Sequence, residues 1–528
     1  MSQPADARPG VGIGAAAMAG ALGAVAIVCP QQAWLVWLSV VPFLWALRHA
    51  PRRLTLVLAV VYTVALGTGS VAPWLTGAAA RYFELSPWHA VFITVPSLAM
   101  IWTAHGAALG LLLLLRPERA SRPWAVVWYG AAWVCWEALR TVLFPYYPAA
   151  VLGVSQYEAL PVLQLASVCG VAGITYAIIA CNVGLAALLP RNVPRQAVFL
   201  QPGTLRAAPP PERSGAPIIT LAAGLAIAAS AAGFGVLRLA TVPPRDGSAG
   251  PALGLVDVGA TAPSARTLAT YLAASRDPAG SPPSTLVWPE SALPTDIERD
   301  RAAWGELSRF VDATGATLIA GGPGSRPRAD GRLARFNSVH VLRPGQGLHS
   351  YHKRLLVPFA EHWPALLGRP PAAIGEVAAG RDLPIFDLGG RHFGVLICFE
   401  ITDGRGARAL AREGASFVLN PTNDAWFTGT APHLPWAVVR AVESGLPLVR
   451  SANAGVNVVI DRYGRRTAGN ARVGPPTLSV VTVPEGRPTP YARAGDVFLI
   501  GCGAIVLVGA IVNRRPVAGR MPTVPRDA

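Results

Sequence analysis

The chain is poor in charged residues, and this shortage limits the classes of protein to which it can belong. Only 14% of its 528 residues are Asp, Glu, Lys or Arg, whereas 52% are hydrophobic, and the mean hydropathy is +0.40. A soluble globular protein contains about 25% charged residues. The composition therefore excludes an ordinary soluble protein and indicates an integral membrane protein. The chain is also too long for one ordinary domain.

Cysteine and histidine are scarce as well. Of the six cysteines, only Cys398 lies outside a long apolar run. A single cysteine in the polar part of the chain excludes an intradomain disulfide there, so its thiol stays free even in an oxidising compartment. His362 and His433 lie near the motifs described below, but no cluster has the spacing of a metal site. We therefore expect neither a metal ion nor a cofactor.

Eight apolar stretches approach the length that crosses a bilayer, about 17–25 residues. They cover residues 11–29, 33–47, 54–74, 88–115, 124–144, 163–189, 218–239 and 497–512, the second being the shortest. Between the last two, the sequence becomes mixed and polar over a length that suits one globular domain. The sequence thus predicts a multi-span α-helical membrane bundle in 1–240, a globular domain in 241–495, and a last helix with a tail in 496–528.

Arginines concentrate in every second loop between these stretches. They follow the second, fourth, sixth and last stretches, as Arg48, Arg52, Arg53, Arg116, Arg119, Arg122, Arg191, Arg195, Arg206, Arg213, Arg514, Arg515 and Arg520. In the loop 76–89, Arg81 is the only lysine or arginine. The positive-inside rule then predicts cytoplasmic termini and an extracytoplasmic globular domain. Much of the formal net charge of +16 lies in these loops, and no basic-aromatic motif is present, so we expect anionic lipid rather than nucleic acid as a partner.

The polar segment alternates between strand-like and helix-like patterns. Strands are expected at 252–258, 286–288, 317–321, 338–342, 394–398, 416–420, 446–451 and 457–461, and helices at 262–275, 301–314 and 406–413. Apolar strands that alternate with helices predict a layered α/β domain. The Pro-containing segment 192–217 is expected to be a loop without a core of its own.

Three chemically distinct side chains occur at or beside the ends of expected strands. Cys398 ends Gly394-Val-Leu-Ile-Cys398, Glu290 follows Leu286-Val-Trp-Pro, and Lys353 follows Tyr351-His. A thiol needs a base or a cation to become a nucleophilic thiolate, and Glu290 suits the base. The oxyanion that forms when a thiolate attacks a carbonyl needs a positive charge or an amide donor, as Lys353 and a backbone N–H would supply. Singly, each residue has an ordinary structural interpretation, but together they indicate acyl chemistry.

Further motifs extend this pattern over the chain. They are Trp-Pro-Glu290, His-Lys353, Val-Pro-Phe-Ala-Glu361, Leu-Ile-Cys398-Phe-Glu400, Asn423-Asp-Ala-Trp-Phe427, Arg450-Ser-Ala-Asn453 and Leu152-Gly-Val-Ser-Gln156. With them, the polar segment resembles the carbon–nitrogen hydrolase domain of the nitrilase superfamily, and the whole chain resembles the bacterial apolipoprotein N-acyltransferase family. The resemblance implies an αββα sandwich with a Glu-Lys-Cys triad.

The resemblance also implies residue roles. Glu290 would be the general base, Lys353 the stabiliser of the oxyanion, and Cys398 the nucleophile, with the backbone amide of Phe399 as a second oxyanion donor. The accessory and substrate-binding positions are expected to be Glu361, Phe399, Glu400, Asn423 and Trp426, where Glu361 and Glu400 would hold the lysine or the incoming amine.

The activity implied by the resemblance is transfer of a fatty acyl group from a phospholipid, through a cysteine thioester, to the α-amine of the diacylglyceryl-cysteine of an apolipoprotein. The expected partners are these two substrates and the bilayer of the bacterial inner membrane, with the domain on the periplasmic side. Nothing in the sequence calls for a second chain, so we expect a monomer. Two alternatives remain open, a membrane-tethered amidase or nitrilase that hydrolyses a small amide and a non-catalytic scaffold.

The sequence departs from the family pattern at three places. Phe399 stands where the family commonly has Tyr, Ala360 where it commonly has Gly, and Ala454-Gly455 where a polar residue commonly follows Asn453. None of these changes removes a member of the triad. In addition, Trp426, Phe427 and Trp363 are candidates for an apolar lip toward the bilayer, with core packing as the open alternative.

Overall fold

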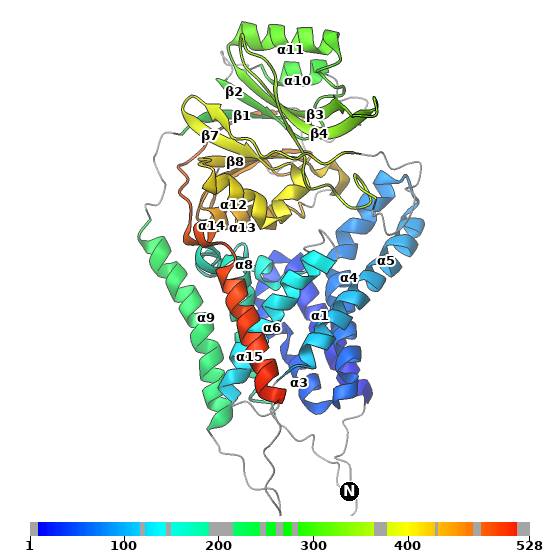
Figure 1. Ribbon diagram of the computed structural model, residues 1–528, viewed down its shortest axis with the longest axis vertical. Helices are drawn as coiled ribbons and strands as arrows, with labels where there is room; N and C mark the ends of the chain where they lie inside the picture. Colours follow the sequence, from blue (N-terminus) through cyan, green and yellow to red (C-terminus); the bar gives the residue numbers. More distant parts are fainter. Residues whose placement is uncertain are drawn as a thin grey trace, which may run out of the picture.

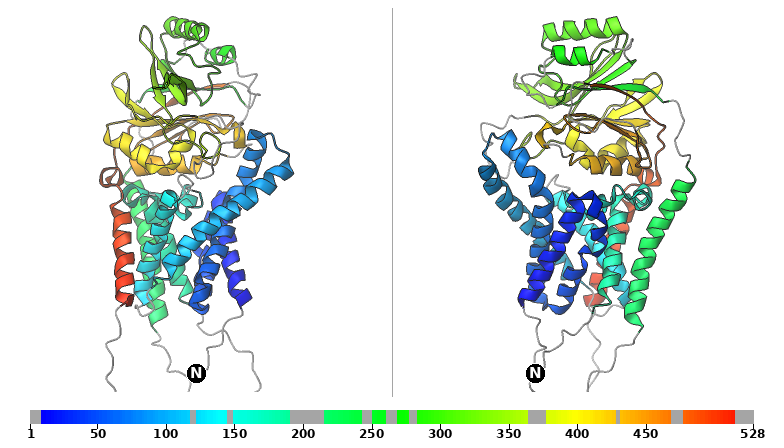
Figure 2. Two further views of the ribbon diagram at one scale, coloured as in Figure 1. Left: turned by 45° about the vertical axis from the view of Figure 1, so that its right-hand side comes forward. Right: turned by 180° about the vertical axis from the view of Figure 1, so that it is seen from behind.

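The protein consists of a helical bundle and a two-sheet domain stacked along one axis (Figure 1). The computed structural model describes residues 9–116, 122–143, 149–189, 215–242, 250–259, 268–276, 283–363, 377–427, 431–467 and 477–514. Most of the expected loop 192–217 and the first part of the expected helix 262–275 lie outside these residues. Two further views show the domain directly next to one end of the bundle (Figure 2).

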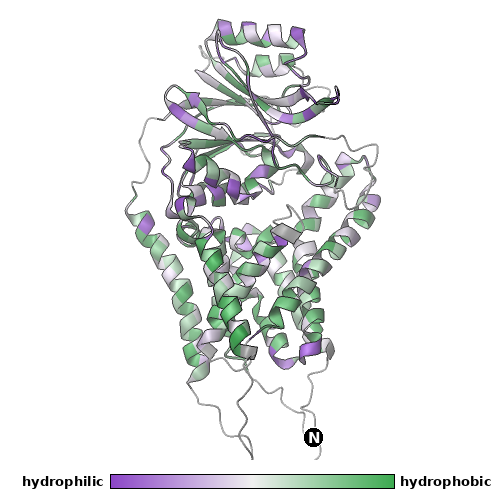
Figure 3. Cartoon of the chain, viewed as in Figure 1, coloured by the Kyte–Doolittle hydropathy of each residue, from purple (hydrophilic) through white to green (hydrophobic). Residues whose placement is uncertain are grey.

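In the described part of the chain, five helices are long and apolar enough to cross a membrane. They are α1 (Pro9–Val28), α4 (Thr55–Tyr82), α5 (Pro87–Leu113), α8 (Ala166–Ala186) and α9 (Ala216–Ala240). Beside them stand α6 (Arg122–Leu143) and the shorter apolar α15 (Val497–Arg514). Hydrophobic residues dominate the bundle, whereas hydrophilic residues are frequent in the domain (Figure 3). The chain is therefore a membrane protein with an α/β domain, as the sequence predicted.

The prediction of one continuous span at 33–47 is wrong. This stretch is divided into a 3₁₀ turn η1 (Pro30–Leu35), α2 (Val36–Ser39) and α3 (Val41–His49). Pro42 at the start of α3 has no N–H to donate to the preceding turn, and the N–H of Val40 instead donates to the Asn182 side chain at 2.9 Å. Because the break lies inside the bundle, neighbouring helices satisfy the freed backbone groups.

The domain contains two six-stranded sheets that pack face to face. The first has the order β12-β1-β2-β3-β4-β5 and the second the order β11-β10-β9-β8-β7-β6. Their bounds are β1 (Ala252–Asp257), β2 (Thr285–Trp288), β3 (Thr317–Pro327), β4 (Leu333–Leu342), β5 (His349–His352), β6 (Phe386–Leu388), β7 (Arg391–Val395), β8 (Phe417–Asn423), β9 (Leu448–Asn453), β10 (Val458–Ile460), β11 (Arg466–Thr467) and β12 (Thr477–Thr482). Every expected strand has a counterpart, but β5, β6, β11 and β12 were not predicted.

Helices cover the outer face of each sheet. The first sheet is covered by α10 (Leu268–Ala274) and α11 (Arg301–Thr314), and the second by α12 (Gly404–Arg412) and α13 (Leu434–Ser444), which face the bundle (Figure 1). Aliphatic residues such as Val287, Ile319, Val395 and Val449 fill the space between the sheets. This is the expected αββα sandwich.

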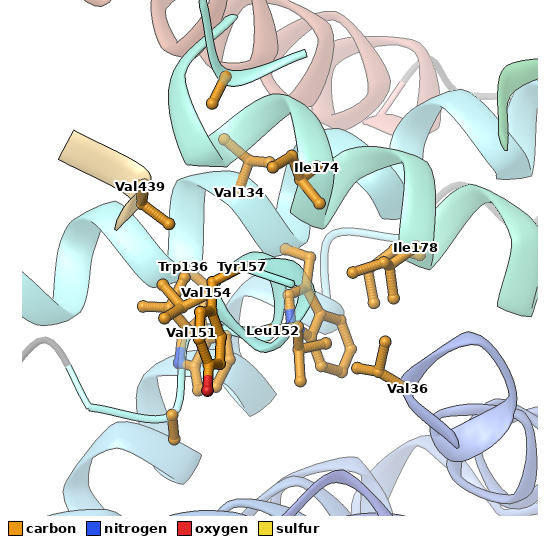
Figure 4. Close-up of a cluster of buried hydrophobic side chains, with 14 of the residues drawn as sticks. Val36, Val134, Trp136, Val151, Leu152, Val154, Tyr157, Ile174, Ile178 and Val439 are labelled. Carbon is orange, nitrogen blue, oxygen red and sulfur yellow. The ribbon is translucent and has the colours of Figure 1, made fainter. Parts of the chain in front are cut away.

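One hydrophobic core runs from the membrane helices into the domain. The same cluster contains Trp136 of α6, Ile174 of α8 and Val439 of α13. In Figure 4, Val439 lies next to the turn that carries Val151, Leu152 and Val154. The domain therefore shares buried apolar surface with the bundle and is not merely tethered to it.

A break in α8 forms a second contact between the two parts. Gly170 has φ 66° and ψ −178° inside the helix, and the freed N–H of Val171 donates to Glu443 Oε1 of α13 at 2.7 Å. Glu443 also forms an ion pair with Arg440, whose guanidinium donates to the carbonyls of Ile401 and Thr402. These bonds connect a membrane helix to the turn η6 (Cys398–Thr402).

Replacing Gly170 tests this contact. In Gly170→Ala the added methyl would meet the Tyr491 ring at 2.7 Å, at a positive φ that alanine rarely adopts. We expect a loss of about 2 kcal/mol of stability from strain and overpacking, seen as a lower melting temperature in detergent. The matched control is Gly233→Ala in α9, where no atom lies within 4 Å of the added methyl. Equal melting temperatures for the two variants would contradict the conclusion that the break at Gly170 is a stabilising contact between the bundle and the domain.

Candidate active site

The structure brings Glu290, Lys353 and Cys398 together from chain segments far apart in the sequence. Glu290 follows β2, Lys353 follows β5, and Cys398 follows β7. Because β2 is parallel to β3, and β5 is antiparallel to β4, which is itself antiparallel to β3, β2 and β5 end at the same edge of the first sheet. The expected strand 394–398 ends earlier, at Val395, and Cys398 instead begins the turn η6 with a φ of 49°. The nucleophile candidate thus lies on a strained turn.

Lys353 is the centre of the polar network. Its side chain is only 1% exposed, and Nζ lies 3.3 Å from Glu290 Oε1 and 2.9 Å from Glu361 Oε2. Burial alone would lower the pKa of Lys353, but the two carboxylates, with a smaller effect of Cys398, outweigh burial and raise the pKa. The lysine is therefore an ammonium group fixed between two acids.

Glu290 and Glu361 are held by further donors. Asn337 Nδ2 donates to both carboxylates at 2.7 Å, and the backbone N–H of Asn423 donates to Glu290 Oε2 at 2.9 Å. Burial of Glu361 favours its neutral form, but the Lys353 ammonium outweighs this effect and, with the hydrogen bonds, lowers the pKa of Glu361. Glu361 thus forms an ion pair with the Lys353 ammonium.

Asn337 was not identified from the sequence. It belongs to β4 and lies opposite Lys353, whose backbone N–H donates to the Asn337 carbonyl at 2.8 Å. The only signal in the sequence is a polar residue in an otherwise buried strand pattern. Asn423 was identified, but it acts on Glu290 through its backbone, while its side chain accepts from the N–H of Ala425 at 3.3 Å.

The thiol of Cys398 is buried, with the residue 7% exposed. Burial, followed by the nearby Glu290 carboxylate, raises the pKa of Cys398 well above its ordinary value, and Lys353 opposes this only in part. The resting sulfur is therefore a neutral thiol at neutral pH. Deprotonation must accompany attack, which requires a base beside the sulfur.

His433 is a further neighbour of the sulfur that the sequence did not assign to the site. Its Nδ1 lies 3.9 Å from Cys398 Sγ, and its ring contacts the rings of Phe399 and Phe427 edge-on. Burial, assisted by Arg450 and Lys353, lowers the pKa of His433 to about 3. The imidazole is therefore neutral and adds no charge to the site.

Glu400 forms no hydrogen bond or ion pair with Lys353, and its expected role in holding the incoming amine stays a prediction. Its carboxylate accepts hydrogen bonds from Tyr351 Oη, from the backbone N–H groups of Arg354 and Leu355, and from that of Ile397, all at 2.7–3.1 Å. These bonds join the segment after β5 to the turn before Cys398. Glu400 thus fixes two active-site segments to each other.

A buried ion pair supports the site from the second sheet. Both Arg450 Nη2 contacts to the Asp424 carboxylate are short, at 2.6 and 2.8 Å, and neither side chain is exposed. Arg450 Nη1 also donates to Asn420, whose amide donates to the carbonyls of Leu396 and Cys398. The motifs containing Asp424 and Arg450 were recognised in the sequence, but this pairing was not.

Aromatic side chains connect the site to the end of α4. The ring of Trp426, which is partly exposed, lies 5.2 Å from that of Tyr82, and Phe427 lies 5.6 Å from Trp74. The hydroxyl of Tyr82 donates to the carbonyl of Ala360 at 2.8 Å. Two of the three expected lip residues therefore pack against a membrane helix, whereas Trp363 contacts Phe359.

Two of the family departures have a structural account. The positive φ in the loop before Glu361 falls on Phe359, at 67°, and not on Ala360, so the extra methyl of Ala360 strains no backbone. At Gly455 an added Cβ would lie 2.2 Å from Asp424 Oδ2. The absence of a side chain at Gly455 therefore leaves room for the Asp424–Arg450 ion pair.

Two family models match the chain, one over the bundle and one over the domain. The apolipoprotein N-acyltransferase N-terminal domain matches residues 19–184, and the carbon-nitrogen hydrolase family matches residues 262–491. Among solved structures, an amidase from Nesterenkonia sp. is 21% identical, with a TM-score of 0.37, over 49% of this chain and 97% of its own.

Curated relatives cover nearly the whole chain. The apolipoprotein N-acyltransferase of Geobacter metallireducens is 30% identical over 522 residues, or 95% of each chain. That of Bradyrhizobium diazoefficiens is 32% identical over 458 residues, which is 81% of this chain and 79% of the relative. The similarity spans both the bundle and the domain, and the chain therefore belongs to the apolipoprotein N-acyltransferase family.

Proposed function

We propose that the protein transfers a fatty acyl group from a membrane phospholipid to the α-amine of the diacylglyceryl-cysteine of an apolipoprotein. The observation that carries this proposal is the buried thiol of Cys398 beside the Glu290–Lys353–Glu361 network. This is an arrangement for acyl transfer through a thioester. Because the domain shares its core with membrane helices, both lipid substrates would reach it in the membrane plane.

In the first step, Cys398 Sγ attacks the ester carbonyl of the phospholipid while Glu290 takes the thiol proton. The developing oxyanion is stabilised by the Lys353 ammonium and by the N–H of Phe399, which directly follows the nucleophile. Collapse of this intermediate breaks the ester C–O bond, and Glu290 returns the proton to the departing alcohol of the lysophospholipid. The acyl group remains on Cys398 as a thioester.

In the second step, the amine of the acceptor attacks the thioester carbonyl. Glu290 takes a proton from the amine, the C–S bond breaks, and the proton returns to the sulfur. The amide product and the free Cys398 thiol result. Glu361 acts indirectly, because it helps to keep Lys353 charged and in place.

We further propose the division 1–240, 241–495 and 496–528 for the functional parts of the chain. In this scheme the protein is a monomer of the bacterial inner membrane with its domain in the periplasm. The ends of helices next to arginine-rich loops support this orientation, because α5 ends and α6 begins at the end of the bundle away from the sheets (Figure 1).

The first prediction concerns the acyl-enzyme. Purified protein incubated with phospholipid should gain the mass of one fatty acyl group on Cys398, and a lipopeptide amine should remove it. Cys398→Ala should gain no such mass, whereas Cys502→Ala, which removes a buried cysteine of α15, should behave like the wild type. Mass spectrometry of the intact protein measures all three. Release of ammonia from small amides, without an acyl adduct, would favour an amidase. If Cys398→Ala still supported cells depleted of their own N-acyltransferase, the protein would instead be a scaffold.

The second prediction concerns the base. Glu290→Gln should slow acyl-enzyme formation by about 10²–10⁴-fold, the usual range for loss of a general base. The amide oxygen can still accept from the backbone N–H of Asn423, and a melting curve shows that the variant is folded before its rate is measured. Single-turnover kinetics measure the rate. Glu298→Gln, which changes an exposed carboxylate bonded to Ser350, is the control and should leave the rate unchanged. A Glu290→Gln variant with the wild-type rate would exclude Glu290 as the base.

The third prediction concerns pH. Because the folded environment raises the pKa of Cys398, the thiol is protonated below that pKa, and the thiolate appears only as the pH rises toward it. Alkylation by iodoacetamide should therefore be slow at neutral pH and still increase above about pH 8.5, where an ordinary cysteine titrates. Alkylation rates across pH, read by mass spectrometry, test this. A plateau already reached at neutral pH would instead indicate a preformed thiolate–ammonium pair.

A further inference from the structure

A cluster of arginines surrounds Tyr463 at the junction of the domain with α9. The guanidinium carbons of Arg462, Arg465 and Arg238 lie 4.9, 5.3 and 5.5 Å from the Tyr463 ring centroid. Arg238 belongs to the last turn of α9, whereas the other residues belong to the turn between β10 and β11. We call Arg238, Arg462, Arg465 and Arg466 the arginine cluster.

The arginine cluster is only partly neutralised. Arg465 pairs with Asp461 at 2.6 Å, and Arg466 with Glu158 at 2.8 Å. Arg238 donates to the hydroxyl of Ser167, which is neutral. Arg462 Nε is buried without a hydrogen-bond partner. Within the described residues, neither Arg238 nor Arg462 forms a salt bridge, so the charges of these two guanidinium groups are not paired with a carboxylate there.

The turn that carries the cluster is firmly held. Gln164 Nε2 donates to the carbonyl of Tyr463 at 2.9 Å, and the N–H of Gly464 donates to the carbonyl of Asp461 at 2.9 Å. Gly464, at a φ of 85°, packs so closely that an added Cβ would lie 2.7 Å from Leu163. The turn that carries Arg462 and Arg465 is therefore held in place.

The position of the cluster indicates what neutralises it. Arg238 is part of the end of α9 that faces the domain (Figure 1). The neighbouring Leu237 and Val236 are 71% and 55% exposed, so an apolar surface adjoins the charges. A phosphate that carries hydrocarbon chains fits this combination. One guanidinium group can donate two parallel hydrogen bonds to two phosphate oxygens. Tyrosine and basic side chains are also common at the level of the lipid headgroups.

We propose that the arginine cluster binds the phosphodiester of an anionic phospholipid, with the acyl chains against α9. Arg238 and Arg462, which form no salt bridge within the described residues, favour an anionic lipid over a zwitterionic one. This site is separate from the reaction, because active-site residues contact α4, and α4 and α9 lie on opposite sides of the bundle (Figure 1). The proposal does not depend on the proposed function. A lipid bound here would bridge a membrane helix and the domain.

The test measures lipid binding and not catalysis. The full chain in neutral detergent is titrated with phosphatidylglycerol, with phosphatidylcholine and with inorganic phosphate, and bound lipid is counted by native mass spectrometry alongside the melting temperature. The wild type should bind phosphatidylglycerol at least about tenfold more tightly than phosphatidylcholine, and the melting temperature should rise. The double variant Arg238→Gln/Arg462→Gln should lose the preference for phosphatidylglycerol. Arg462→Lys keeps the positive charge and is the milder change for folding, so it should retain part of this preference.

The control is Arg309→Gln on α11, at the end of the domain farthest from the bundle, which should bind like the wild type. An unchanged preference for phosphatidylglycerol in the folded double variant would overturn the proposal. So would equal binding of both lipids by the wild type. Protection by inorganic phosphate as strong as that by phosphatidylglycerol would replace the lipid with a free anion and would also overturn it.

Discussion

The active site depends on one interaction, the Lys353 ammonium held out of water between Glu290 and Glu361. Burying such an ion costs several kcal/mol, and a single carboxylate would offset this only in part. Here two carboxylates contact the ammonium, and Asn337 donates to both of them. Burial is the main cause of the raised pKa of the Cys398 thiol, and the nearby Glu290 carboxylate raises this pKa further. The site therefore favours a neutral thiol over a stored thiolate.

The remaining buried polar groups fix where these three side chains stand. Glu400 joins the segment after Lys353 to the turn before Cys398. From the other sheet, the Asp424–Arg450 ion pair holds the strand end whose backbone N–H binds Glu290. Such a network is costly if any partner is lost. These bonds explain how a cysteine with a positive φ is held in place in the turn that follows β7.

Much of this was predictable because strand patterns and strand-end residues are local properties of a sequence. Glu290 and Cys398 could be recognised as polar groups after buried strands, and the apolar stretches gave the bundle. Asn337 could not, since its contact with Glu361 depends on the pairing of β4 with β5. His433 comes from the start of α13, and only the packing of that helix on the second sheet brings it to the sulfur. The break within residues 33–47 could not be predicted from hydropathy, because hydropathy measures only how apolar a stretch is. It does not show that Pro42 begins a new helix.

The contact between bundle and domain bears on how substrates reach the sulfur. Tyr82, at the end of α4, donates a hydrogen bond to the loop before Glu361. The ring of Tyr82 also packs on Trp426, and Trp74 of α4 packs on Phe427. On the other side, Val171 of α8 is linked through Glu443 and Arg440 to the turn that bears Cys398. The turn of Cys398 is thus linked to one membrane helix, and the loop before Glu361 and the pair Trp426 and Phe427 rest on another. Because the two anchors belong to different membrane helices, the position of Cys398 relative to the loop before Glu361 depends on how α4 and α8 pack in the bundle.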